Sequence, residues 1–189
     1  MVSAATAAAA PMRPPIEVPH HRETCVGAAA SYVLRRIALR AGALAPGIQD
    51  GKFYDLTTPR AGISIESVQR WLADESAGLS NLGYRFGARW TSGESAALAS
   101  WVHAGRGYRG AVVPTVQPRL YVGQAATCGS DHAVGLVVEP WGTATADVVM
   151  IDPWPEGGRG DRLDPLETLD AARRDHGHAA LVLHWNGWG

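Results

Sequence analysis

The strongest constraint on the fold of this chain is a helical pattern whose first turn is built from small residues, Gly27 followed by three alanines. Thr24 can serve as the N-cap of this helix, so Cys25 occupies the first helical position. An apolar stripe continues from there to Gly42, which ends the helix. Because glycine and alanine leave room for a neighbour, we expect another element to approach the first turn closely. Three basic residues are predicted to lie outside the stripe: Arg35, Arg36 and Arg40.

Two valine-rich runs around His132 and Asp152, residues 131–138 and 148–154, predict the two strands of a hairpin with a loose turn between them. With the turn centred near Gly142, His132 and Asp152 face each other directly across the pair. Directly opposed side chains have Cβ atoms roughly 5 Å apart, which allows a carboxylate to hold an imidazole nitrogen. Both strands are apolar at nearly every position, so both of their faces should be covered. In that setting His132 and Asp152 are costly unless they partner each other.

The chain order of these residues indicates a thiol enzyme. A cysteine at a helix start, a histidine and then an aspartate on consecutive strands is the order of a nucleophile, its base and the group that orients the base. The positive end of the helix dipole favours a thiolate at Cys25, and a nearby imidazolium would lower the thiol pKa further. Each residue also has a structural interpretation: Cys25 as a small buried hydrophobe, His132 as a satisfied core residue and Asp152 as a turn former. The joint pattern favours a catalytic triad of Cys25, His132 and Asp152.

Cys128 is the alternative nucleophile, because the chain has two cysteines. Its neighbours, residues 125–130, are typical of a loop, which offers no helix dipole to activate the thiol. A disulfide between Cys25 and Cys128 is conceivable in an exported protein and would mask the nucleophile. The first ten residues lack the basic opening and the long apolar stretch of a signal peptide. We therefore expect two free thiols and a cytoplasmic location.

Composition and charge narrow the possible partners. The 189 residues, 46% of them hydrophobic, suit one domain with a sizeable core. With 17 basic and 18 acidic residues the formal net charge is -1, which gives no electrostatic basis for binding nucleic acid or an anionic membrane. No apolar run is long enough to span a bilayer. Residues 1–16, rich in alanine and then in proline, are expected to form a disordered leader ahead of the domain.

The middle of the chain predicts two helices followed by a sheet. Ser64 can cap the first of these helices, and Thr91 or Ser92 can cap the second, which Gly105 closes. Apolar runs then predict further strands, with a short helix before the last of them. Helices first and an antiparallel sheet second indicate an α+β domain, with a helical lobe packed on a sheet lobe and the active site at their seam. The further strands span residues 110–116, 120–123 and 179–185, and the short helix spans residues 164–172.

The same residues resemble the papain-like cysteine peptidases in their small bacterial form. The similarity is to double-glycine leader peptidases of bacteriocin export and to papain-like effector proteases of plant pathogens. It extends over residues 18–185 and implies a single papain-like domain at residues 17–189, its N-terminal helical lobe packed on the antiparallel sheet. By position it makes Cys25 the nucleophile, His132 the general base and acid, and Asp152 the residue that orients His132. The motifs that carry it are the helix of Cys25, residues 107–113, which resemble the strand entry of these families, residues 131–134, and residues 149–155 with their Asp-Pro-Trp-Pro ending.

Two positions depart from the pattern of these families. A glutamine shortly before the cysteine usually donates a hydrogen bond to the oxyanion, and here the stretch before Cys25 contains no glutamine. Val26 also stands where a glycine commonly follows the cysteine. The backbone N–H of Cys25 remains available as one oxyanion donor, and His20, His21 or Arg22 could supply the second.

Two reactions therefore remain open for the expected acyl-enzyme. The first is hydrolysis of a peptide or amide bond by a cysteine peptidase. The second is acyl transfer or cyclisation of a chain bound as a thioester to a carrier protein, as papain-like scaffolds perform in natural-product biosynthesis, and the absent glutamine favours it mildly. A binding module that has kept the fold without catalysis is a third interpretation, which the intact set of Cys25, His132 and Asp152 disfavours. The expected partner is a peptide or an acyl chain on its carrier.

The remaining motifs give little support for a metal or a cofactor. Two histidine clusters, residues 20–21 and 176–178, have no cysteine or carboxylate at a zinc-like spacing, so we expect neither a metal site nor a cofactor. The glycine-rich residues 157–160 lack the lysine of a phosphate-binding loop. Trp141 and Trp154 lie on loops beside the expected histidine and aspartate, where they could form walls of a substrate groove.

Overall fold

The computed structural model describes nine stretches of the chain. They are residues 25–42, 64–73, 84–105, 107–116, 132–138, 148–151, 169–170, 173 and 178–188. The helices and strands in these stretches are, in chain order, α1 (Cys25–Arg40), α3 (Ile65–Ala73), β1 (Tyr84–Ser92), α4 (Ser95–Ala104), β2 (Arg109–Val116), β3 (His132–Val138), β4 (Val148–Ile151) and β5 (Ala179–Trp188).

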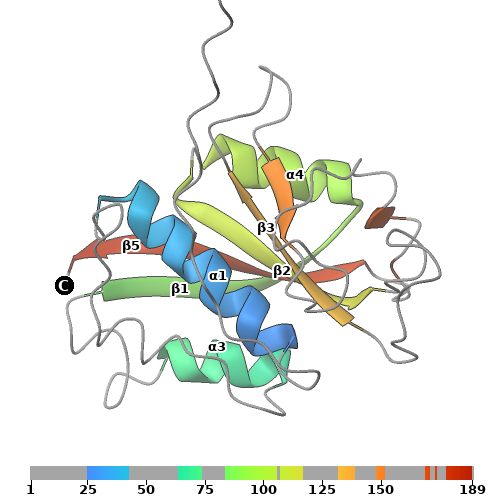
Figure 1. Ribbon diagram of the computed structural model, residues 1–189, viewed down its shortest axis with the longest axis horizontal. Coiled ribbons are helices and arrows are strands. Elements are labelled where there is room, and N and C mark those ends of the chain that lie inside the picture. The colour runs from blue at the N-terminus through green and yellow to red at the C-terminus, as the bar shows by residue number, and fades with distance from the viewer. Residues whose placement is uncertain are drawn as a thin grey trace, which may run out of the picture.

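The strands form one five-stranded sheet in the order β1-β5-β2-β3-β4 (Figure 1). Every neighbouring pair in this sheet is antiparallel. The last strand of the chain, β5, lies between β1 and β2, so the sheet joins segments that are far apart in the sequence. The α+β class and the antiparallel sheet are therefore confirmed.

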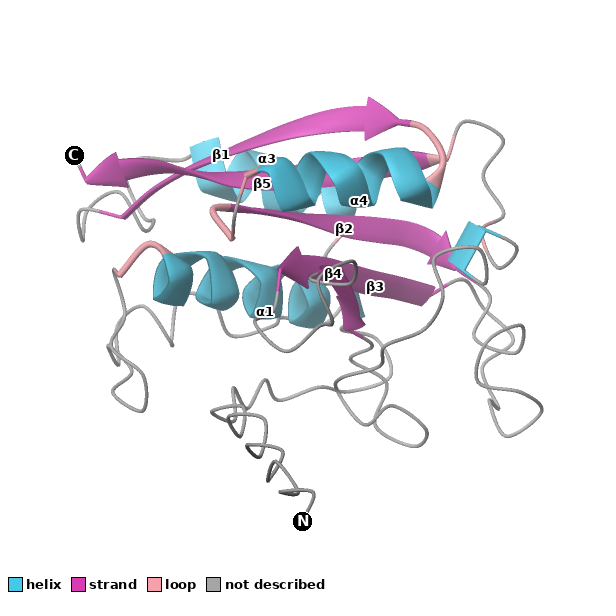
Figure 2. Ribbon diagram, turned by 90° about the horizontal axis from the view of Figure 1, so that it is seen from above, coloured by secondary structure: helices cyan, strands magenta, loops and turns pink. Residues whose placement is uncertain are grey.

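Helices cover both faces of the sheet. α1 and α3 contact each other on one face, whereas α4 packs on the other, and Figure 2 shows α1 and α4 on either side of β2. The side chains of β3 alternate accordingly, since Ala133 and Val137 join the core beneath α1 while Leu136 joins the core beneath α4. α1 and α3 therefore lie together, whereas α4, which the sequence also predicts among the helices before the sheet, covers the opposite face. Local sequence patterns do not indicate which face of a sheet a helix covers, and the position of α4 was not predicted.

α1 begins and ends where its sequence predicts. Cys25 is its first residue, and the turn after the helix closes at Gly42, which has a φ of 73°. The N–H of Gly42 donates a hydrogen bond to the carbonyl of Leu39 at 3.1 Å. The helix also lies very close to β2, because a Cβ added at Gly110 would stand 2.4 Å from Cγ1 of Val33. The absence of a side chain at Gly110 therefore sets how closely α1 approaches the sheet.

Arg35 and Arg36 are buried, so the prediction that they lie outside the packed stripe is wrong. Their exposed fractions are 1% and 5%. Nη2 of Arg36 donates a hydrogen bond to the hydroxyl of Tyr32 at 3.0 Å, and the guanidinium carbon lies 5.2 Å from the centre of the Tyr32 ring. A single apolar stripe is typical of a helix that packs on one side, whereas α1 contacts α3 and three strands, β2, β3 and β5.

The predicted order of two helices and then a sheet is also wrong, because β1 lies between α3 and α4. Thr91 and Ser92 are the last residues of β1 and do not cap α4. The N-cap position of α4 is Glu94, whose side chain makes no capping hydrogen bond. Instead, Oδ1 of Asp170 accepts a hydrogen bond from the N–H of Ser95 at 2.7 Å. A cap supplied from 75 residues away leaves no local pattern in the sequence of α4.

The other helix ends follow the predictions. Gly105 stands directly after α4 and its N–H donates to the carbonyl of Val102 at 3.1 Å. At the start of α3, Oγ of Ser64 accepts a hydrogen bond from the N–H of Ser67 at 3.3 Å, which is the N-cap geometry expected of a serine. In the described part of the chain no helix combines the length and the apolar character needed to cross a membrane.

The predicted strands at residues 110–116 and 179–185 correspond to β2 and β5. Residues 1–16 and 120–123 lie outside the described stretches. Of the helix expected at residues 164–172, the structure describes Leu169 and Asp170, and both are helical.

Candidate active site

Cys25 stands at the N-terminal tip of α1, where the first backbone N–H groups of a helix have no intrahelical partner. The thiol is free and half-buried, and it packs against the edge of the core beneath α1. Three small residues behind it, Ala28, Ala29 and Ala30, are fully or almost fully buried. The small first turn thus places the sulfur against the sheet, as the sequence predicts.

His132 is the first residue of β3 and is 2% exposed. Its backbone partner in β2 is Val116, reached after a register shift that follows Val113. α1 packs across β2 and β3, which brings the beginning of the helix to the beginning of β3. As a result, the His132 side chain forms a hydrogen bond with the thiol of Cys25.

The pKa of the Cys25 thiol reflects several opposing effects. Burial, the largest of them, raises the pKa, whereas the hydrogen bond and the positive charge of His132 lower it. The backbone N–H groups of Ala133 and Val26 also donate to the sulfur and lower it further. The balance is a pKa below the ordinary value of 9.0. The site can therefore hold a thiolate beside an imidazolium, the ionic form of a nucleophile and its acid.

The contribution of Ala133 was missed by sequence reasoning. Its methyl group carries no chemistry, and the useful group is a backbone N–H that every residue except proline possesses. Nothing in the residue type distinguishes it. It could have been suspected only from its position, next to His132 at the start of β3.

The pairing of β3 with β4 differs from the predicted hairpin by two residues. Gly135 pairs with Ile151, and the other pairs of this ladder have the same midpoint, Thr143. A hairpin centred on Gly142 would have placed Gly135 opposite Val149. The predicted centre is therefore wrong, and a direct opposition of His132 to Asp152 does not follow from the observed register.

The other residues that the sequence nominates lie outside the described stretches. They are Asp152, which directly follows β4, the rival nucleophile Cys128, and the proposed oxyanion and groove residues His20, His21, Arg22, Trp141 and Trp154. Their roles remain predictions. Within the described stretches, no group of three or more His, Cys, Asp and Glu side chains is arranged to hold a metal ion.

Comparison of the chain with protein-family models, with curated proteins and with solved structures found no match. Cys25 and His132 are therefore the residues whose chemistry indicates a function.

Proposed function

We propose that this chain is a papain-like cysteine enzyme that forms an acyl-enzyme at Cys25 and hydrolyses a peptide or amide bond. The observation that carries the proposal is the contact between Cys25 and His132, which lowers the thiol pKa although burial raises it. A helix that begins with the nucleophile, packed on an antiparallel sheet in which β3 begins with the base, also supports a papain-like arrangement.

The reaction requires two steps at this pair. In the first, the sulfur of Cys25 attacks the substrate carbonyl carbon and a C–S bond forms; the C–N bond then breaks as His132 gives its proton to the leaving nitrogen. In the second, water attacks the carbonyl carbon of the thioester while His132 removes a proton from it. The C–S bond breaks, a carboxylic acid leaves, and the thiolate of Cys25 and the protonated His132 are restored.

The negative oxygen that forms in each step needs hydrogen-bond donors. The backbone N–H of Cys25 lies at the open end of α1 and supplies one donor. We assign the second donor to His20, His21 or Arg22. Single alanine variants at these positions should identify one where amide turnover falls about 100-fold or more, while turnover of a simple thioester falls much less. Wild-type amide turnover in all three variants would exclude this stretch as the donor.

Acyl transfer or cyclisation from a carrier-bound thioester is the second candidate function, favoured by the absence of glutamine before Cys25. A thioester is already activated, so it depends less on a complete oxyanion hole than an amide does. Intact-mass analysis after incubation with an amide substrate and with an acyl-carrier thioester separates the two. Acylation of Cys25 by the thioester, without any amide cleavage, would replace hydrolysis by acyl transfer as the function.

The decisive experiment for the proposal is the pH dependence of Cys25 alkylation by iodoacetamide, followed by peptide mapping. The wild type should react with a midpoint below pH 9.0, the ordinary thiol pKa. In His132→Ala the midpoint should rise, because burial remains while the hydrogen bond and the charge are lost. His103→Ala is the matched control, since His103 is exposed on α4 at the other face of the sheet. Superimposable profiles for wild type and His132→Ala would refute the proposed pair.

A further inference from the structure

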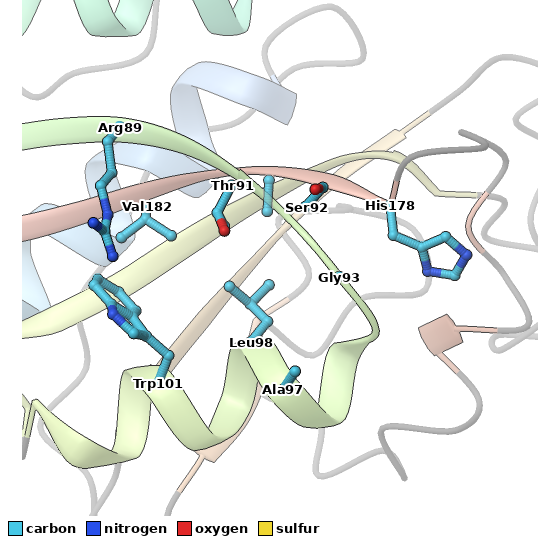
Figure 3. Close-up of a pocket in the computed structure, with 10 residues that line it drawn as sticks. Arg89, Thr91, Ser92, Gly93, Ala97, Leu98, Trp101, His178 and Val182 are labelled. Atoms are coloured by element: carbon cyan, nitrogen blue, oxygen red, sulfur yellow. The ribbon is translucent and has the colours of Figure 1, made fainter.

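A second feature of the molecule lies on the α4 face of the sheet, away from the core against which Cys25 packs. It is a hollow of about 200 Å³ between α4 and the strands β1 and β5 (Figure 3). Its apolar wall includes Leu98, Trp101 and Val182, whereas Arg89, Thr91 and Ser92 bring polar groups to it from β1. Neither Cys25 nor His132 lines it, so any ligand of this hollow is independent of the proposed hydrolysis.

Positive charge gathers at one end of the hollow, around the indole of Trp101. The guanidinium carbons of Arg89 and Arg109 lie 5.1 Å and 4.3 Å from the centre of this ring. His184 pairs with Arg109 in the sheet, on the strand next to Arg89. Burial first, and then the charges of Arg109 and Arg89, lower the pKa of His184. Two arginines therefore act on one histidine in a single small region.

No carboxylate in the described stretches forms an ion pair with either arginine. Asp170, one of the carboxylates in the described stretches, is engaged at the opposite end of the hollow. Its Oδ1 accepts from the N–H of Ser95 at 2.7 Å and lies 3.6 Å from Nδ1 of His178, which lines the hollow there. Both guanidinium groups attract an anion, and Arg89, which lines the hollow, would contact one that entered it.

The size and the lining of the hollow define the ligand more closely. A guanidinium stacked on an indole is already oriented, so it loses little freedom when it binds a carboxylate or phosphate through two hydrogen bonds. Thr91 lies two residues after Arg89 on the same face of β1, so its hydroxyl group supplies a further donor. The apolar remainder can take a ring, because a cavity of about 150 Å³ lined by apolar side chains holds a benzene molecule.

We propose that the hollow between α4, β1 and β5 is a binding site for a small organic anion, its carboxylate or phosphate on Arg89 beside Trp101 and its compact apolar body against Leu98 and Val182. Binding can be followed by tryptophan fluorescence, because a ligand beside the indole of Trp101 changes its emission. Three probes test the chemistry: phenyl phosphate, benzoate, and the uncharged benzyl alcohol. Inorganic phosphate serves as the anion without an apolar body.

Titrations followed by tryptophan fluorescence and by calorimetry should show saturable binding of phenyl phosphate or benzoate and none of benzyl alcohol. The anion that binds with the higher affinity shows whether the site prefers a phosphate or a carboxylate. Inorganic phosphate should bind more weakly than phenyl phosphate, and equal affinities would overturn the apolar half of the proposal. Failure of both organic anions to saturate would overturn the site as a whole.

Variants locate the binding. Arg89→Gln should lower the affinity for the preferred anion about tenfold or more, as expected for loss of a charged hydrogen-bond donor. Arg85→Gln removes the same charge from an exposed position on β1 that does not line the hollow, and it should leave affinity unchanged. Ala97→Leu fills the hollow from an exposed position and should abolish binding while all charges remain. Equal losses in Arg85→Gln and Arg89→Gln, or full binding in Ala97→Leu, would refute the site. All three variants should keep the wild-type alkylation rate of Cys25.

Discussion

The close approach of α1 to the sheet can be tested at Gly110. In Gly110→Ala the new Cβ would stand 2.4 Å from Cγ1 of Val33 and 2.9 Å from the carbonyl oxygen of Leu136. Carbon atoms in contact are normally separated by about 3.5–4.0 Å, so Val33 and its helix must move by roughly 1 Å. Overpacking of this kind costs about 1–3 kcal/mol. Alanine also restricts the unfolded chain more than glycine does, and this entropic effect offsets about 0.4–1 kcal/mol of the loss.

The expected net loss is therefore about 1–2 kcal/mol, or a fall in Tm of about 2–8 °C for a chain of this size. Urea denaturation measures the first quantity and calorimetry the second. Because α1 carries Cys25, the displacement should also slow alkylation of the thiol at neutral pH.

A double-mutant cycle with Val33→Ala supplies the control for Gly110→Ala. Removing Cγ1 of Val33 relieves the closest contact but leaves the carbonyl of Leu136, so rescue should be partial. We expect a favourable coupling of about 0.5 kcal/mol or more between the two substitutions. A Gly110→Ala protein as stable as wild type, or strict additivity in the cycle, would show that α1 does not lie this close to β2.

Three further predictions concern single sites. Burial raises the pKa of Cys25, but His132 and the backbone N–H groups of Ala133 and Val26 together lower it below the ordinary value. Ionisation of Cys25 should therefore stabilise the fold fully above about pH 9, and this contribution should be lost as the pH falls through the lowered folded-state pKa. The difference in unfolding free energy between wild type and Cys25→Ser should accordingly grow as the pH rises. Asp170→Ala should lower the free energy of unfolding, measured by urea denaturation, by about 1 kcal/mol, because α4 loses its cap. Asp170→Asn should lower it less, since the amide keeps an oxygen that accepts from the N–H of Ser95. Equal stabilities of the two variants would contradict a capping role for Asp170. His132→Ala should lose turnover on the order of a thousandfold, whereas Asp152→Asn should retain measurable turnover. Equal losses in the two variants would count against an orienting role for Asp152.

The sequence predicts α1 well because its ends are encoded locally. A capping residue and a glycine predict helix ends from a few neighbouring residues. α1 does begin at Cys25, and the turn that follows it closes at Gly42. The burial of Arg35 and Arg36 could not be read in the same way. It depends on how many elements surround α1, and those elements come from distant parts of the chain.

β1 was overlooked although its sequence carries a usable pattern. Phe86 is buried in the core beneath α1 and Ala88 packs against it, whereas Arg85 and Arg89 at alternate positions are exposed. This is the alternation of a strand with one covered face. The two arginines and a glycine within it obscured the pattern. The cap of α4 by Asp170, by contrast, has no local counterpart that could have been found.

The two-residue error in the β3–β4 register has a limited consequence for the proposed site. Side chains alternate between the faces of a sheet with a period of two, so a shift of one residue would have moved every side chain of β4 to the wrong face. A shift of two preserves this alternation and changes only which residue of β3 each residue of β4 opposes. Asp152 itself lies outside the described stretches, so its support of His132 stays a prediction. The comparison of Asp152→Asn with Asp152→Glu tests that prediction. If a carboxylate orients His132, Asp152→Glu should retain more turnover than Asp152→Asn, and equal losses would count against this role.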